Sequence, residues 1–358
     1  MKKTFYTFFS LIILLLIFNF IAGIFFWVWN RNKDSIAKIY VDAPYVYYKQ
    51  NSFETGFNIQ DELTLNKASN ELRILILGGS VAYSMGNVLS TFDSSGSKTN
   101  NPSYLEAKIK NILPHKKITV INGALPAYVT QQEFIAFQMI LSKYNPDLVF
   151  GIHGFNDMES FRVNHHIDDL KYIPSPIFYG GDEFSPALTA INEHKKEYTF
   201  QGVTEGYYKY IRKGFRFLGR SLKLYKYPFE NTNDINDKKI EAYALAYKSI
   251  CSDLSNFCSI KGVKYINFLQ PVKFYNSKDS NYHTSNNQQL KPISPWLSKL
   301  YFKMEDLSNS LPNNHNLTGL DMKKLEMKDD CHPSETGYKY LIDEIVLKIT
   351  PDLLLLNK

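Results

Sequence analysis

Short apolar runs recur along the middle of the chain, and the first three end in glycine or asparagine. They read RILILGG from Arg73, KITVING from Lys117, PDLVFGIHG from Pro146 and VKYINFLQP from Val263. Continuous rather than alternating apolar residues are typical of strands that are buried on both faces, as in a parallel sheet. The pattern therefore predicts four buried strands.

Helical patterns lie between and after these runs. The stretches SYLEAKIKNIL and QQEFIAFQMILSKY each place apolar residues on one face, and so does the last helical stretch of the chain, with Tyr338, Leu341, Ile342, Ile345 and Ile349. A helix that connects two parallel strands must cover a face of their sheet. We therefore expect an α/β domain in three layers, α/β/α, around a central parallel sheet.

The beginning of the chain has a different pattern. Residues 5–29 carry no charged side chain, and this length of apolar sequence can cross a bilayer as a helix. We interpret 1–4 as a short tail, 5–29 as an uncleaved transmembrane signal anchor and 30–70 as a juxtamembrane connector. A cleaved signal peptide is the alternative, and lysine and arginine on both sides leave the orientation open.

Two polar stretches interrupt the α/β pattern. We place the folded domain at 71–350, with one insertion at 158–240 that is rich in tyrosine and charged residues. A second insertion, at 273–325, is rich in asparagine, serine and lysine. We expect both insertions to cap or line a functional site.

Composition narrows the classes of function. The chain has 358 residues, of which 44% are hydrophobic and 15% aromatic, and this excludes a disordered protein. Its net charge of +6 is compatible with a membrane surface or an acidic polymer. No zinc-finger spacing or aromatic RNA-binding signature accompanies that charge, so we expect no nucleic-acid partner. The charge by itself identifies no ligand.

Cofactor and metal motifs are missing from the sequence. It has neither the dinucleotide fingerprint nor the P-loop, and no histidine pair has a spacing such as H-E-x-x-H, so we expect no cofactor and no metal. The three cysteines exclude a dense disulfide framework. Cys251 and Cys258 lie two helical turns apart, too far to bridge.

Chemistry-bearing residues follow the predicted strands or precede the last helix. Ser80 ends the first run, Asn156 follows the third in GFND, and His332 stands in DDCHPSETGYKYL. Functional groups gather at the carboxyl ends of parallel strands, so these residues are expected to meet. His332 can take the proton of the Ser80 hydroxyl, and Asp329 can orient its imidazole. Asp330 is the competing carboxylate.

An acyl-transfer site also needs donors for a developing oxyanion. The Ser80 N–H, an N–H of the loop NGALPAYVT and the Asn156 side-chain amide can converge on one point. Each of these short motifs, or blocks, also has a simpler interpretation. Gly-Gly-Ser is also a common tight turn, Asn156 and Asp157 are good helix caps, and His153 fits a buried core position.

The order of these blocks resembles the SGNH, or GDSL-type, hydrolase superfamily, in particular its bacterial membrane-anchored or exported members. The resemblance implies a flavodoxin-like fold with Ser80 as nucleophile, Asn156 as an oxyanion donor, and Asp329 and His332 completing a triad. The sequence departs from the family at two positions. Ala127 stands where the second block has a glycine that donates its backbone N–H, and Gly79 stands where an aspartate is common.

The sequence thus predicts a membrane-anchored serine esterase with its catalytic domain outside the cytoplasm. The substrate would be an acyl ester, on a glycan or a lipid. Two alternatives stay open: an O-acyltransferase or deacetylase that acts on a cell-surface polysaccharide, and a non-catalytic, membrane-tethered binding protein that keeps the fold. The acyl group, the acceptor and the oligomeric state are not encoded in a readable pattern.

Overall fold

The computed structural model describes four long stretches of the chain, residues 64–88, 104–164, 235–273 and 295–356. It also describes the short pieces 40–43, 47–50, 281–283 and 290–292, and a few helical residues between Tyr6 and Ile17. Most of the predicted anchor, most of the connector up to residue 63 and most of the first insertion lie outside the described residues.

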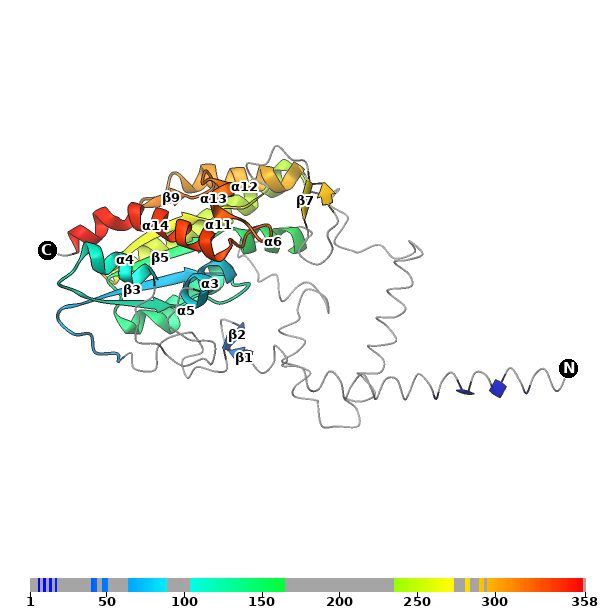
Figure 1. Cartoon of the computed structure of the whole chain (residues 1–358). Helices are drawn as coiled ribbons and strands as arrows, with labels where there is room; N and C mark the ends of the chain where they lie inside the picture. The colour runs from blue at the N-terminus through cyan, green and yellow to red at the C-terminus, as the bar shows by residue number, and fades with distance from the viewer. Residues whose placement is uncertain are drawn as a thin grey trace.

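Strands and helices alternate along the four long stretches (Figure 1). In chain order they are β3 (Glu71–Gly78), α3 (Ser80–Val88), α4 (Tyr104–Ile112), β4 (Lys117–Asn122), α5 (Thr130–Met139), η1 (Leu141–Tyr144), β5 (Leu148–His153), α6 (Phe155–Asn164), α11 (Asp237–Ile260), β6 (Lys264–Leu269), α12 (Pro295–Ser308), β9 (Asn314–Asn316), α13 (Met322–Leu325) and α14 (Glu335–Leu355). Two antiparallel hairpins accompany them, β1 (Tyr40–Ala43) with β2 (Tyr47–Gln50), and β7 (Asn281–His283) with β8 (Leu290–Pro292).

The central sheet has five strands in the order β4-β3-β5-β6-β9, and all of its pairings are parallel. Counted along the chain, this is the doubly wound, flavodoxin-like order. The expected α/β fold with a central parallel sheet is therefore confirmed. The order reverses between β3 and β5, because β4 lies on one side of β3 and the later strands lie on the other. Such a reversal leaves a crevice at the carboxyl ends of the strands.

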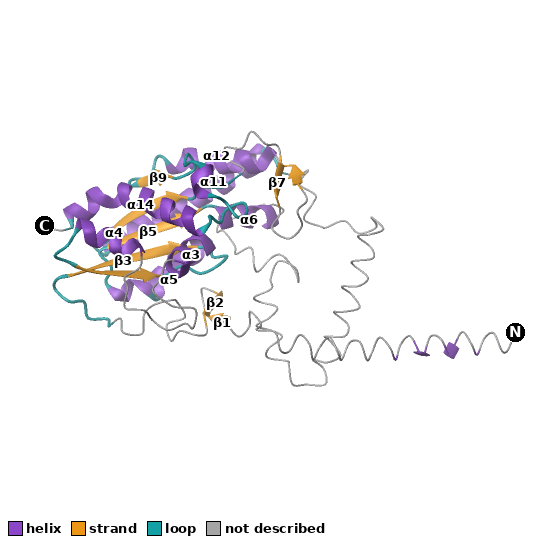
Figure 2. Cartoon of the chain, in the orientation of Figure 1, coloured by secondary structure: helices purple, strands orange, loops and turns teal. Residues whose placement is uncertain are grey.

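Every residue of β3 is buried, including Glu71 and Arg73 at its amino end, and burial of Ile74–Leu77 agrees with the prediction from their continuous apolar run. Ile74 and Ile76 point to one face and pack with apolar residues of α4 and α14. Leu75 and Leu77 point to the other face and pack with residues of α5 and the end of α11. Figure 2 shows the resulting layers, with helices on both sides of the strands. The same two-sided burial explains why the run contains no alternating polar residue.

Part of the stretch expected to be a second insertion belongs to the folded layers. Within 273–325, α12 packs against α11, and β9 pairs with β6 as the last strand of the sheet. β9 has no apolar run: Asn314 and Asn316 hold it through side-chain hydrogen bonds, with Asn267 donating to Asn314 at 2.6 Å. A short edge strand held by amides gives no hydrophobic signal, so the sequence pattern missed it.

The cysteine expectation is confirmed. Cys251, Cys258 and Cys331 are all free and buried.

Within the parts of the chain that the structure describes, we find no helix that combines the length and the apolar character of a membrane span. The anchor at 5–29 stays a prediction.

Candidate active site

The turn from β3 into α3 presents Ser80 at the carboxyl edge of the sheet. Ser80 is the first residue of α3, so its hydroxyl lies at the positive end of a helix dipole. Gly78 has φ 150°, and a Cβ there would come within 2.4 Å of the Ala82 Cβ and 2.7 Å of the Ile152 carbonyl oxygen. Only glycine therefore permits this tight entry into the helix.

Asn156 reaches the same edge from the first turn of α6. Its Nδ2 donates to the Tyr128 carbonyl oxygen at 2.8 Å, and an amide nitrogen carries two N–H groups. The Asn156 amide packs directly over Gly79, because a Cβ on Gly79 would lie 2.0 Å from Nδ2. Glycine at position 79 therefore leaves the space that this amide occupies.

The loop between β4 and α5 carries Ala127, which has the left-handed φ of 62°. This conformation strains an L-residue and is the one that glycine adopts readily. The start of the loop follows the end of β3, with the Gly123 N–H donating to the Ile76 oxygen and the Leu125 N–H donating to the Gly78 oxygen. Ala127 thus has a backbone conformation that glycine more commonly adopts.

His332 lies between Ser80 and Asp329. The Ser80 Oγ is 2.7 Å from His332 Nε2, and the two Asp329 oxygens are 2.9 and 2.8 Å from His332 Nδ1. The backbone N–H groups of Cys331 and His332 also donate to Asp329 Oδ1. The structure thus brings together the three residues that the sequence predicted, and Asp329 rather than Asp330 contacts the imidazole.

The two neighbouring carboxyl groups have opposite pKa shifts. Burial opposes the charge of Asp329, but hydrogen bonds from His332 and from two backbone N–H groups lower its pKa to about 2. Burial and the charges of Asp329 and Glu159 raise the pKa of Asp330 to about 6. Asp329 is therefore fully ionised at neutral pH, which is the state that holds an imidazole Nδ1–H.

Donors for an oxyanion are left open beside Ser80. In the described part of the chain, no acceptor takes the backbone N–H of Ser80 or that of Ala127. The first N–H groups of a helix have no partner within it, so the Ser80 N–H at the beginning of α3 is available as a donor. The Ala127 N–H and the second N–H of Asn156 are further donors on the segments that follow β4 and β5.

A metal-binding arrangement also falls within this site. Of the described residues, Asp329, Cys331 and His332 have donor atoms that could hold an ion, all within 4.8 Å of one another. Two of these residues already form the hydrogen-bonded pair described above. Burial raises the pKa of the Cys331 thiol well above its ordinary value, which disfavours the thiolate that metals prefer.

Three buried residues behind the site, Glu133, His153 and Asp157, are not predicted from the sequence to belong to it. His153 lies in the core, which is one of its two sequence interpretations. It forms an ion pair with Glu133, and the sequence pattern does not predict this contact. Asp157 joins the beginnings of α5 and α6. One signal was available: Glu133 is a charged residue directly followed by the apolar residues 134–137 of the same helix.

No family model matches the sequence, and no curated protein is similar to it. Among solved structures, the backbone is similar to that of an acylhydrolase from Bacteroides fragilis described as putative, with 12% identity, a TM-score of 0.41, and coverage of 82% of this chain and 92% of that one. An acetyl xylan esterase shares 8% identity with a TM-score of 0.40, covering 78% of this chain and all (100%) of that one. A GDSL-like lipase from Bacteroides thetaiotaomicron shares 11% identity with a TM-score of 0.38, covering 80% and 90%. The solved structures to which this chain is similar thus include proteins described as a GDSL-like lipase, an acylhydrolase and an acetyl xylan esterase.

Proposed function

We propose that this protein is a serine ester hydrolase with Ser80 as its nucleophile, anchored to a membrane by residues 5–29. One observation carries the proposal: His332 Nε2 is 2.7 Å from the Ser80 hydroxyl while Nδ1 is 2.8 Å from the ionised Asp329. A serine is a weak nucleophile until a base removes its proton. The contacts supply that base and fix its orientation.

The reaction would proceed in two halves. His332 Nε2 takes the Ser80 proton as Oγ attacks the ester carbonyl, and the same proton then leaves with the departing alcohol. Water then attacks the acyl-enzyme and loses its proton to His332, which returns that proton to Ser80 Oγ as the acyl–Oγ bond breaks and the carboxylic acid is released. Asp329 accepts the Nδ1–H throughout and stabilises the imidazolium that forms.

The oxyanion of each tetrahedral intermediate would accept from the N–H groups of Ser80 and Ala127 and from the Asn156 amide. One such donor contributes about 100-fold to 1,000-fold in kcat. The beginnings of α3 and α6 add the positive ends of two helix dipoles. The left-handed backbone of Ala127 supports this assignment, because the loop keeps the conformation that glycine would have.

The first residues of the chain support the proposal of a membrane anchor. The helical residues described there have exposed apolar side chains, including Tyr6 at 66%, Phe9 at 54% and Leu14 at 69%. Apolar surface of this kind is covered by lipid in a spanning helix. An anchor of this kind favours a substrate at the cell surface, and we propose that the catalytic domain lies outside the cytoplasm.

An O-acyltransferase or deacetylase acting on a surface polysaccharide is the second candidate. It keeps the same acyl-enzyme and differs only in the acyl acceptor, which would be a sugar hydroxyl in the transferase. Mass spectrometry of surface glycans from cells with and without the Ser80 hydroxyl distinguishes this candidate from a general esterase. A change in glycan acylation supports it, and an unchanged pattern contradicts it.

Turnover of p-nitrophenyl acetate by the full-length chain in detergent tests the proposal. Ser80→Ala should abolish turnover and labelling by a fluorophosphonate probe, which needs an activated serine. Ser84→Ala, one helical turn further along α3, is the matched control and should keep both. Full activity of the Ser80→Ala variant would contradict the proposal. A wild type with no activity and no labelling would favour the binding-protein alternative.

A further inference from the structure

Three ionisable side chains are buried directly behind the site, and the proposed chemistry uses none of them. Glu133 is 1% exposed, His153 2% and Asp157 1%. Removing charged groups from water costs several kcal/mol for each ion unless their partners compensate. A cluster of this kind under a candidate active site therefore needs a reason beyond stability.

Asp157 connects the first turns of two helices. Its Oδ1 accepts the Thr130 N–H at 3.1 Å, and Oδ2 accepts the Thr130 hydroxyl at 3.0 Å and the Gly154 N–H at 3.2 Å. Thr130 begins α5, and Gly154 immediately precedes α6. A carboxylate at two helix beginnings is stabilised by both dipoles. Asp157 thus joins the loop before α5 to the turn before α6.

Glu133 and His153 form a second connection between the same two segments. His153 Nδ1 is 2.5 Å from Glu133 Oε2, and Nε2 is 2.9 Å from the Tyr265 hydroxyl. That hydroxyl donates its own proton to Asn267 Oδ1 at 3.1 Å, so its oxygen accepts from the imidazole. Nδ1 thus faces a carboxylate oxygen across a short contact, while Nε2 lies at hydrogen-bond distance from the Tyr265 oxygen.

The facing carboxylate favours the protonated form of His153. Burial lowers the pKa of His153, but the facing Glu133 outweighs burial and raises it. Room for the ring comes from the strand itself. A Cβ on Gly151 would lie 1.8 Å from His153 Nε2. The glycine within the buried run LVFGIH thus admits a charged side chain into the core.

Both connections end next to the candidate oxyanion donors. Asn156 is the neighbour of Asp157, and its amide donates to the Tyr128 oxygen. Ala127 and Tyr128 precede Thr130 by two or three residues in the same loop. The relative position of the Ala127 N–H and the Asn156 amide is therefore set by the contacts that tie this loop to α6.

We propose that Asp157 and the Glu133–His153 ion pair are positioning residues of the oxyanion hole, which hold the Ala127 loop and the beginning of α6 in register. This inference rests on the proposed esterase function. An oxyanion hole acts only if its donors are fixed before the reaction, and small displacements reduce the rate strongly. The cluster fixes the donors without contacting the substrate.

Steady-state kinetics of the full-length chain with p-nitrophenyl acetate test the proposal. Thr130→Val removes the hydroxyl that donates to Asp157, and Glu133→Gln removes the negative charge that faces His153. Both substitutions keep the size of the side chain. We expect kcat to fall at least 10-fold in each variant with KM unchanged, because the donors contact the transition state more strongly than the substrate. Thr130→Ser restores the hydroxyl and should recover most of kcat.

Glu71→Gln is the matched control, because Glu71 belongs to a buried ion pair at the opposite end of the same sheet. It should lower the melting temperature and leave kcat unchanged at a temperature where all variants are folded.

Wild-type kcat in both Thr130→Val and Glu133→Gln would overturn the inference. An equal fall in Thr130→Val and Thr130→Ser would also overturn it. If Glu133→Gln does not fold, the Thr130 pair alone decides. An inactive wild type would instead overturn the proposed function itself, and this inference with it.

Discussion

Polar groups at the two ends of the parallel sheet differ in how fully they are hydrogen-bonded. At the amino end, the buried Glu71 accepts from Arg73 at 3.2 Å, from Thr119 at 2.6 Å and from the Ala68 N–H at 3.1 Å. Arg73 also donates to the carbonyl oxygens of Tyr144 and Asn66. These contacts outweigh the cost of burial and lower the pKa of Glu71 to about 2.

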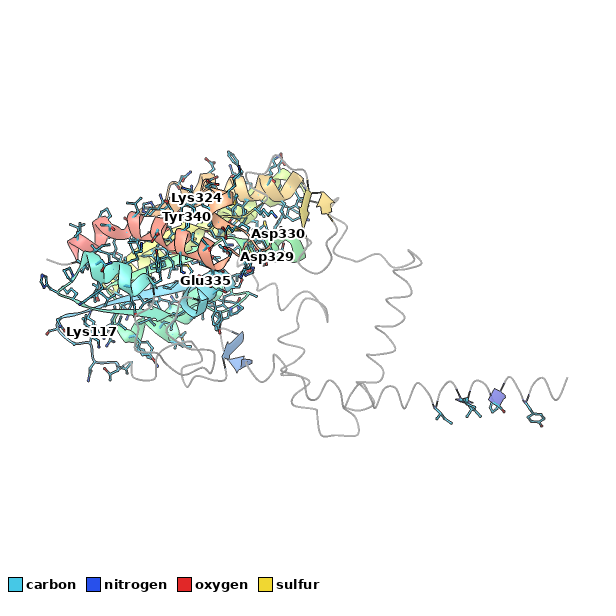
Figure 3. All side chains as sticks on the ribbon, viewed as in Figure 1. Lys117, Lys324, Asp329, Asp330, Glu335 and Tyr340 are labelled. Carbon is cyan, nitrogen blue, oxygen red and sulfur yellow. The ribbon has the colours of Figure 1, made fainter. Side chains whose placement is uncertain are left out.

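At the carboxyl end, several N–H groups have no acceptor among the described residues. The N–H groups of Ser80 and Ala127 have no acceptor among the described residues, and the Asn156 amide uses one N–H on Tyr128. The backbone of Ala127 is strained, and the pKa of Asp330 is raised. Figure 3 shows Asp329 and Asp330 at this end and Lys117 at the other.

Within one sheet, the contacts at the amino end therefore contribute to stability, whereas the open donors at the carboxyl end are available for a reaction. Saturated contacts lower the free energy of the folded state, whereas open donors and backbone strain persist only where the surrounding structure holds them. Substitutions at the amino end should therefore change stability and not turnover. At the carboxyl end, a substitution that displaces a donor should lower turnover, whereas one that relieves backbone strain or a buried charge should raise stability.

The largest effect is expected at Gly79. In Gly79→Ala the new Cβ would displace the Asn156 amide, which lies 2.0 Å from its position, and we expect kcat to fall about 100-fold. The melting temperature should change little, because the end of a side chain moves rather than the backbone. Gly319→Ala, where a Cβ meets nothing within 4 Å, is the control. An unchanged kcat in Gly79→Ala would remove Asn156 from the proposed mechanism.

Glu71→Gln tests the amino end. The variant loses the ion pair with Arg73, and we expect the free energy of unfolding at pH 7 to fall by about 2 kcal/mol. Because the pKa of Glu71 in the folded protein is below its ordinary value, this stabilisation is present above about pH 4.5 and disappears as the pH falls towards 2. Urea denaturation at several pH values measures it. A gap between the variant and the wild type that widens in acid would contradict the comparison.

Asp330→Asn should give the opposite pH dependence. Because the folded protein raises the pKa of Asp330 to about 6, ionisation of this group costs stability as the pH rises from about 4 to 6 and above. The variant should be more stable than the wild type at pH 8, by about 1 kcal/mol after allowing for solvent screening. Below pH 4 the two proteins should unfold alike. Equal stability at pH 8 would contradict the prediction.

The smallest effect is expected at Ala127. Ala127→Gly relieves the left-handed strain but gives the unfolded chain more freedom, so we expect a net gain of about 0.5 kcal/mol in thermal unfolding. Turnover should stay near that of the wild type, because the N–H keeps its place. Ala124→Gly, at a buried position of the same loop with ordinary backbone angles, should destabilise instead. A loss of stability in Ala127→Gly would show that the loop is not strained.

The sequence by itself determined the framework of this protein. Continuous apolar runs such as Ile74–Leu77 predict strands buried on both faces, and the helical spacing of Tyr338 and Leu341 predicts a covering helix; both are found as expected. It also placed Ser80, Asp329 and His332 at the carboxyl edge, because strand ends and a local three-residue spacing are readable along the chain.

Only the tertiary structure decided which polar groups meet across the sheet. The pairing of Glu133 with His153, the connection that Asp157 makes to Thr130 and the contact of Asn156 with Gly79 join residues from different elements. β9 likewise depends on amide contacts with β6 rather than on apolar residues of its own. Apolar periodicity records which face of an element is buried, but hydrogen bonds between distant side chains depend on the register and packing of whole elements, and these arise only when the chain folds.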